Sequence, residues 1–396
     1  MELSRNLWRR KLRSILTISG IFMGILALTT MGAMAEHFNS LIAGGVTFYG
    51  DHIQVGASSN GDSGGILQMS KAEDLRRVPG VVAVSPSVTV AAKPGDVNAI
   101  TFGVPDYISS QDPNYARYGT FKTSYASGHA VAPGENGGVV LGSSLAVEFK
   151  KRVGDTIALP VRPSDAPIDF VNHNFQVVGV LSPTLTAPDA GAFINLHDAQ
   201  VLMGDSLPPA LRGTIDPHLL VSGLVVYGAP GVNLDTLADR INAQVVGVKA
   251  LRPSVIVASF KAGGAVFTLI TTAAALLALV IGGLSVVNTM LMAVTERVRE
   301  IGLKKAVGAR TGAILRDFLS ESTLIGAVGG TLGLGAGAAL VAAANAGAGA
   351  SPLFQLTPRL ALLSLGFAVL LGAVAGMLPA WRAARMDPVQ ALRSVG

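Results

Sequence analysis

The chain has 396 residues, of which 50% are hydrophobic and 14% are charged, whereas a soluble domain has about 25% charged residues. This composition excludes intrinsic disorder and is unlike that of an ordinary cytosolic protein. The chain has no cysteine, which excludes disulfide scaffolds, thiolate metal sites and cysteine nucleophiles.

The net charge of +5 is unevenly distributed along the chain. Residues 37–260 hold 14 lysines and arginines against 18 aspartates and glutamates, so this segment carries −4 and the remainder carries +9. The basic residues flank apolar segments, a pattern typical of membrane borders, so no nucleic-acid partner is predicted.

The N-terminal segment combines a basic stretch, residues 1–13, with an uncharged run over 14–35. A membrane helix needs about 20 apolar residues, so the run predicts the first transmembrane helix. The basic stretch predicts a cytoplasmic interfacial helix, whose membrane-contacting residues are Arg5, Trp8, Arg9, Arg10 and Arg13. The alternative is a signal peptide cleaved after the Ala33-Met34-Ala35 sequence, but the apolar run is longer than the usual 7–15 residues.

Three further uncharged runs follow, at 262–295, 322–358 and 360–381. The first of these would measure about 51 Å as a helix against a bilayer core of about 30 Å, so we expect it to be a stalk joined to transmembrane helix 2. In the next run we expect transmembrane helix 3 over 322–344, followed by a short Gly- and Pro-containing outer turn over 345–359. The last run predicts transmembrane helix 4.

Basic residues fix the predicted orientation of these spans. They cluster before the first span, in the loop 296–317 and in the tail 382–396, whereas the turn before the fourth span has one arginine. The positive-inside rule therefore places both termini and the loop in the cytoplasm and residues 36–261 outside.

The outer segment 36–261 predicts an α+β domain. Five stretches have the composition of strands, and they are residues 81–92, 97–104, 137–142, 155–161 and 174–181. Four stretches have helical periodicity, and they are residues 67–78, 143–153, 196–204 and 234–245. The stretch 107–138 is rich in Ser, Gly, Pro and Asn, which favours an inserted lobe or a long loop.

Motifs for catalysis are weak. Gly61-Asp62-Ser63-Gly64-Gly65 matches the sequence around the nucleophile of trypsin-like proteases, but only His37 and His52 precede it, both close to the first span. A Gly/Ser turn is the favoured interpretation. All six histidines lie outside the spans without metal-ligand spacing, and the 396 residues contain no G-x-x-x-x-G-K-[ST] phosphate loop. We therefore predict no metal site and no ATP hydrolysis by these residues, although a cluster formed only by folding would escape this test.

The third span contains overlapping small-xxx-small steps, the pattern by which membrane helices approach closely. The residues are Gly326, Gly329, Gly330, Gly333 and Gly337. The pattern does not distinguish packing within one chain from a subunit interface.

The loop 296–317 predicts a short amphipathic helix ended by Gly308, with Val298, Ile301, Leu303 and Val307 on one side. Physical reasoning supports two interpretations equally: a basic helix lying on anionic lipid, and a helix that docks on a protein.

This loop resembles the signature of the MacB-like permease family, the FtsX/LolC group of ABC transporters. The resembling residues are Glu296-Arg297, Arg299-Glu300-Ile301-Gly302, Ala306-Val307-Gly308-Ala309, Glu321 and Gly329-Gly330. The C-terminal stretch PAWRAARMDPVQALR and the N-terminal stretch NLWRRKLRSILTISGIFMG are also similar to that family. The outer domain matches more loosely, through stretches such as VPGVVAVSP and FQVVGVL.

The resemblance implies four transmembrane helices and an extracytoplasmic domain of porter-like and Sabre-like subdomains. It implies a non-catalytic homodimer in the bacterial plasma membrane, bound to two copies of an ABC ATPase that holds ATP and Mg. Because 13 residues precede the first span, a separate ATPase chain is expected. The implied ATPase-coupling residues are Glu296, Arg297, Arg299, Glu300, Ile301, Gly302, Lys304, Lys305, Ala306 and Gly308.

The implied function is ATP-driven mechanotransmission that exports or extracts a hydrophobic, amphiphilic or peptide substrate, with a periplasmic adaptor as a further candidate partner. The alternative is an FtsX-like signalling module that regulates an extracytoplasmic cell-wall hydrolase. A membrane-anchored outer enzyme is a third hypothesis, disfavoured because no catalytic set of residues is recognisable.

Overall fold

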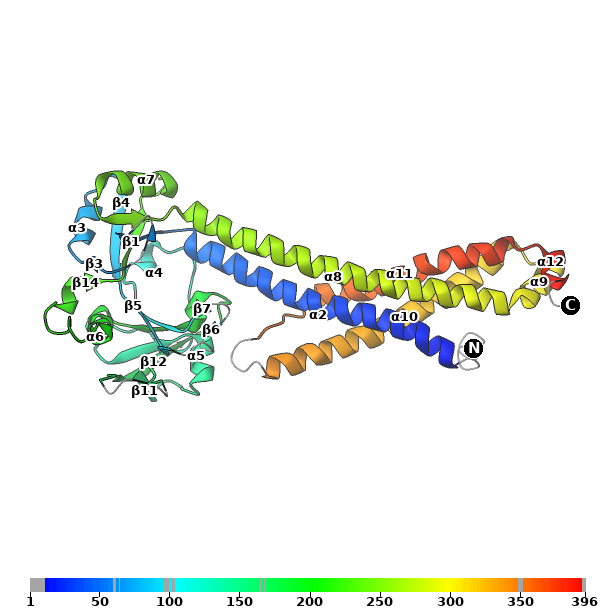
Figure 1. Ribbon diagram of the computed structural model, residues 1–396, viewed down its shortest axis with the longest axis horizontal. Coiled ribbons are helices and arrows are strands. Elements are labelled where there is room, and N and C mark those ends of the chain that lie inside the picture. The colour runs from blue at the N-terminus through cyan, green and yellow to red at the C-terminus, as the bar shows by residue number, and fades with distance from the viewer. Residues whose placement is uncertain are drawn as a thin grey trace. The chain divides into compact units, whose positions relative to one another are not determined.

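A computed structural model describes residues 11–59, 62–63, 65–95, 100–101, 104–163, 166, 169–347 and 352–393. The chain divides into two compact units. A helical unit takes in the described residues of Met1–Phe38, Ala265–Ala348 and Pro352–Gly396, and a mixed unit takes in those of Asn39–Gly264. Figure 1 shows the long helices of the first unit and the sheets of the second.

Four helices of the described residues are long and apolar enough to cross a membrane. They are α2 (Lys11–Tyr49), α8 (Pro253–Glu296), α10 (Thr311–Gly347) and α11 (Pro358–Arg385). The mixed unit lies between α2 and α8 in the chain, so this is a four-helix membrane protein with an α+β domain between helices 1 and 2.

The first helix is longer than the sequence predicts. The prediction ended at residue 35 because Glu36 interrupts the uncharged run, but α2 continues to Tyr49. Its extension lies against α8: the ring of Phe260 covers Gly45 and stacks on Tyr49 with ring centroids 5.5 Å apart. Packing against a neighbouring helix stabilises a helix more than its own sequence does. Both α2 and α8, at 39 and 44 residues, therefore exceed a bilayer core of about 30 Å.

The mixed unit contains two main sheets. The first is antiparallel with the order β16-β1-β15-β4, and β2 pairs with β1. The second is mixed with the order β11-β12-β10-β13-β8-β5, and β9 pairs with β12. Two short pairs, β14-β3 and β6-β7, complete the described strands. One hydrophobic core takes buried residues from both sheets, including Val226 of the first and Val177 of the second.

The strands of the mixed unit, in chain order, are β1 (Ile53–Ser59), β2 (Asp62–Ser63), β3 (Leu67–Gln68), β4 (Val81–Ser87), β5 (Thr89–Ala91), β6 (Ile100–Thr101), β7 (Val104–Pro105), β8 (Tyr107–Ser110), β9 (Tyr125–Gly128), β10 (Gly138–Leu141), β11 (Thr156–Leu159), β12 (His173–Leu181), β13 (Gly191–Ile194), β14 (Leu220–Val221), β15 (Gly223–Gly228) and β16 (Val248–Ala250). The shorter helices of this unit are α3 (Lys71–Arg76), α4 (Tyr115–Tyr118), α5 (Ser143–Glu148), α6 (Leu196–Ser206) and α7 (Leu234–Gln244), with two 3-10 turns, η1 (Ala187–Ala190) and η2 (Pro217–Leu219).

Two predictions for this unit are wrong. The helix predicted over 67–78 begins only at Lys71, because Leu67 and Gln68 pair with β14 as a strand. The stretch 107–138 is not an inserted lobe: β8 lies inside the second sheet, between β13 and β5. Ile108 is fully buried there, so sheet pairing outweighs the loop-like composition around it.

Within the GDSGG motif, Gly61 and Gly64 lie outside the described residues, and Asp62 and Ser63 pair with β1.

Candidate functional site

The turn between α8 and α10 holds a separate short helix, α9 (Val298–Ala306). Helix α8 ends at Glu296, and Arg297 breaks the helical path with φ −107° and ψ 15°. Gly308 ends α9 as predicted: at φ +96° it takes a conformation that side-chain-bearing residues rarely adopt. Its N–H donates to the carbonyl of Lys305, and the next N–H, of Ala309, donates to the carbonyl of Lys304.

The predicted apolar face of α9 is in fact divided between two sides. Ile301 is 3% exposed and packs in one core cluster with Ile314 and Phe318 of α10. Leu303 and Val307 are 58% and 82% exposed. Successive helical residues turn by about 100°, so Leu303 lies about 200° around the helix from Ile301. Two exposed aliphatic side chains are therefore left beside a buried face.

Three charged residues at α9 form ion pairs within the chain, namely Arg297, which directly precedes the helix, and Glu300 and Lys304 on it. Arg297 contacts Glu321 of α10 through two nitrogen–oxygen distances of 2.9 and 3.5 Å. The ammonium of Lys304 lies 3.5 Å from Glu300 and 3.6 Å from Asp317. Two of the implied ATPase-coupling residues, Glu300 and Lys304, therefore have ion-pair partners within this chain. Because both are more than half exposed, this pairing contributes little to stability and leaves them accessible.

A C-terminal helix, α12 (Pro388–Arg393), supports α9. A Cβ added to Gly302 would lie 2.7 Å from the Cβ of Ala391, so only glycine permits this approach without a shift. The ammonium of Lys305 donates to the carbonyl of Met386 at 2.8 Å. The sequence predicts a tail over 382–396 and no helix within it. The sequence feature that marks the start of α12 is Asp387-Pro388, which is typical of a helix N-terminus. Asp387 accepts a hydrogen bond from the N–H of Val389.

The other predicted coupling residues are solvent-accessible. Glu296, Arg299 and Ala306 are exposed around α9. Of the predicted membrane-interface residues, Arg5, Trp8, Arg9 and Arg10 lie outside the described part of the chain. Arg13 falls in the first turn of α2, where only the helical backbone is described.

The glycines of the third span face two neighbouring helices of the same chain. Gly326 and Gly330 lie against Ala368 of α11. Three others form a second stripe against α2, in which Gly329 meets Ile21, Gly333 meets Ile25 and Gly337 meets Thr29. These contacts favour packing within the chain over a subunit interface for this stripe.

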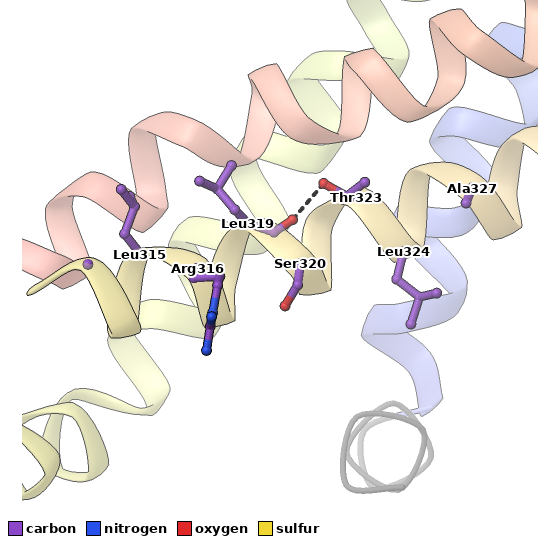
Figure 2. A pocket seen from close by; sticks show the side chains of 8 residues that line it. Leu315, Arg316, Leu319, Ser320, Thr323, Leu324 and Ala327 are labelled. Atoms are coloured by element: carbon purple, nitrogen blue, oxygen red, sulfur yellow. Dashed lines mark hydrogen bonds between the residues drawn. The ribbon is translucent and has the colours of Figure 1, made fainter. Parts of the chain in front are cut away.

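An open groove of about 560 Å³ runs along α10 (Figure 2). Arg316, Ser320 and Leu324 lie on the side of α10 away from α11, and Thr323 donates to the carbonyl of Leu319. Because every described lining residue belongs to this one helix, the groove lacks the opposing wall that a small-molecule site has.

A buried polar network that sequence reasoning missed lies in the mixed unit, where α2 gives way to β1. His52 Nδ1 lies 2.7 Å from Asp51 Oδ1, and Thr120 donates its N–H and hydroxyl to Asp51 Oδ2. Burial alone would raise the pKa of Asp51, but the hydrogen bonds from His52 and Thr120 lower that pKa below its ordinary value. Burial and the nearby carboxylate of Asp112, which accepts from the Tyr227 hydroxyl at 2.8 Å, raise the pKa of Tyr227.

The histidines do not build a recognisable metal centre. Among the described residues no group of three or more His, Asp or Glu is placed to hold a metal ion. The rings of His197 and His218 stack with centroids 4.6 Å apart, and His173 pairs with Asp205.

Comparisons with known proteins agree with this architecture. Residues 14–244 match the MacB-like periplasmic core domain, and residues 272–388 match the FtsX-like permease C-terminal region. The macrolide export ATP-binding/permease protein MacB of Shewanella sp. (strain W3-18-1) is 29% identical over 96% of this chain. The pyoverdine export ATP-binding/permease protein PvdT of Pseudomonas fluorescens (strain Pf0-1) is 28% identical over 98% of it. The chain spans 58% of the length of each of these relatives.

Among solved structures, the periplasmic region of MacB from Actinobacillus actinomycetemcomitans matches 56% of this chain and 95% of its own, with 13% identity and a TM-score of 0.35. The core-domain match alone covers more than half of the chain, and the permease match covers most of the remaining helical part. The chain therefore belongs to the MacB-like permease family.

Proposed function

We propose that this protein is the permease component of an ABC transporter, in which α9 receives movement from an ATPase. The ATPase would bind ATP and Mg, and the permease would perform no catalysis itself. Family membership supports this proposal, as do the names of relatives that combine ATP binding, a permease and export. The proposal places the chain in the bacterial inner membrane as a homodimer, with both termini in the cytoplasm.

The observation that carries the proposal is an exposed apolar pair at the end of α9. Leu303 lies on α9 and Val307 directly follows its last residue, and a break separates α9 from α8. Both side chains are exposed, while the side of α9 that carries Ile301 is packed. Exposed aliphatic residues surrounded by charges are typical of a protein docking site. The rival occupant is anionic lipid, on which α9 would lie as an interfacial helix.

The length of α2 and α8 supports mechanical transmission. Each is a single helix that exceeds the bilayer core and continues into the mixed unit. A displacement applied near α9 would thus be transmitted along these helices to the outer domain. The substrate would not need to pass between the helices. We propose that the outer domain moves a hydrophobic, amphiphilic or peptide substrate on the outer side of the membrane.

Co-purification tests the proposal. The tagged chain is expressed with candidate ABC ATPases, and bound ATPase and ATP hydrolysis are measured in lipid nanodiscs. We expect an ATPase to bind. Leu303→Ser with Val307→Ser should weaken binding at least tenfold, because the interface would lose two aliphatic side chains that the ATPase would otherwise bury. Val246→Ser is the matched control, because Val246 is 84% exposed in the mixed unit.

Failure of every ATPase to bind would overturn the proposal, and contact of Leu303 and Val307 with anionic lipid of the nanodisc would support the lipid-facing alternative. Capture of a cell-wall hydrolase by the outer domain, with ATPase binding intact, would replace export by signalling.

A further inference from the structure

The joint between α8 and α9 consists of one residue, Arg297. A break in a helix is a compliant point, where an applied displacement bends the chain instead of travelling along it. If this joint were free, movement of α9 would be lost before it reached α8. The side chain of the joint residue is, however, held by another helix.

Glu321 of α10 holds the Arg297 guanidinium through two contacts, of which the shorter is 2.9 Å. The two side chains are 25% and 15% exposed. A planar guanidinium held at two points by a carboxylate is fixed in orientation as well as position. The neighbouring pair of Lys304 and Asp317 is a useful contrast, because its members are 51% and 59% exposed and 3.6 Å apart.

Glu321 directly precedes the part of α10 that packs through serine and glycine residues. The next residue, Ser322, is fully buried against Gly372 and Gly376 of α11. Further along the same unbroken helix, Gly329, Gly333 and Gly337 lie against α2. Close-packed interfaces of small residues resist sliding, since there is no free volume to take up a shift. A force applied at Glu321 therefore acts on α10 and α2 together.

We propose that the Arg297–Glu321 ion pair is a positioning contact that carries the displacement of α9 into α10 and through it into α2. This inference rests on the proposed function, in which an ATPase moves α9. It gives the outer domain a second mechanical input: α8 connects to α9 through the chain, and α2 connects to α9 through this ion pair and the glycine stripe.

The test uses the natural lack of cysteines. Spin labels are placed on exposed positions of α9 and α10 as Ala306→Cys and Ser320→Cys in the full chain, after this labelled chain is shown to bind the ATPase. The distance distribution between the labels is measured in nanodiscs, with and without trapped nucleotide, by double electron–electron resonance. We expect one distribution in both states, because α9 and α10 move together.

In Glu321→Gln we expect ATPase binding to persist, but the distribution to shift or broaden when nucleotide is trapped, and ATP hydrolysis by the complex to change several-fold. The exchanged pair Arg297→Glu with Glu321→Arg should restore the single distribution, which a loss of folding would not do. Asp317→Asn, one turn earlier on α10, is the control and should leave the distribution unchanged.

The outcomes separate the inference from the proposed function. An unchanged distribution in Glu321→Gln with the ATPase bound overturns the inference alone. So does an exchanged pair that behaves like the single variant. An ATPase that does not bind the wild-type chain overturns both.

Discussion

At the scale of single residues, glycines set the distance between helices, because glycine has no side chain. Gly330 and Gly333 on α10 lie against α11 and α2 respectively, where a Cβ would meet Ala368 or the backbone oxygen of Phe22. Gly335 lies on the same helix with nothing within 4 Å of the position of an added Cβ. Residue type alone therefore does not reveal which glycine matters, whereas the contacts do.

The first prediction compares these positions. Gly330→Ala should destabilise the helical unit by about 1–3 kcal/mol, because the added methyl group overfills a close-packed contact. Gly335→Ala should cause no loss, since alanine favours the helix and meets open space. Thermal unfolding of the purified chain in detergent measures both. Equal loss of stability in the two variants would contradict the contact-based assignment.

The second prediction concerns Asp51. Because the folded-state pKa of Asp51 lies below its ordinary value, its stabilising effect is fully present above the unfolded-state value, about 3.9, and is lost as the pH falls through the folded-state pKa. Asp51→Asn should lower the free energy of unfolding by about 1.5–3 kcal/mol at pH 7, the range for a hydrogen bond to a charged group.

Calorimetry at pH 7 and pH 3 checks this prediction, and the difference between wild type and Asp51→Asn should shrink at pH 3. Asp239→Asn is the control, because Asp239 forms an exposed pair with Arg252 and should change stability by less than about 1 kcal/mol at either pH. A loss of stability in Asp51→Asn, relative to wild type, that increases toward pH 3 would contradict this prediction.

At the scale of elements, α9 depends on α12 for its position. Ala391 is 2% exposed beneath Gly302, whereas Val389 of the same short helix is 63% exposed. The two residues differ by about 200° around the helix, so one faces α9 and the other faces away. The C-terminal helix is thus a support for the proposed docking site.

The third prediction follows from this support. Ala391→Leu should displace α9 and lower the amount of co-purified ATPase at least threefold, whereas Val389→Leu should retain it. Quantification of ATPase in the eluted complex checks both variants. A loss with Val389→Leu and none with Ala391→Leu would mean that α12 binds the ATPase directly instead of supporting α9.

The elements also show how far sequence reasoning reaches. The four apolar helices were predictable because their signal is local composition, and Gly308 was predictable because a helix end needs a left-handed residue. The extension of α2 to Tyr49 was missed because Phe260 stabilises it from a distant part of the chain. The pairing of Arg297 with Glu321 was likewise invisible, since the two residues meet only through the packing of Ile301 and Phe318.

At the scale of the whole molecule, the proposed orientation puts two exposed valines on opposite sides of the membrane. Val246 belongs to the mixed unit and Val307 to the turn after α9, and they are 84% and 82% exposed. The basic residues around the turn favour the cytoplasm for Val307, and the acidic balance of the mixed unit is compatible with the outer side for Val246.

The fourth prediction uses these positions as single cysteines. A membrane-impermeant maleimide added to intact spheroplasts should label Val246→Cys, and should label Val307→Cys only after the membrane is permeabilised. The wild-type chain, which has no cysteine, gives the background. Labelling of Val307→Cys in intact cells would invert the proposed topology.

The order of strands in the mixed unit has a consequence for how such proteins diversify. The chain leaves the first sheet after Ser87, builds the second sheet, and returns at Gly223, which pairs with Ser87. The Ser222 hydroxyl accepts from the N–H of Thr89 at 2.8 Å, so exit and return lie side by side. The lobe that holds the second sheet is therefore an insertion whose two ends are adjacent. Such an arrangement tolerates replacement of the inserted segment. Recombination at these two points would replace the lobe that holds the second sheet as a cassette, while the membrane helices are inherited unchanged.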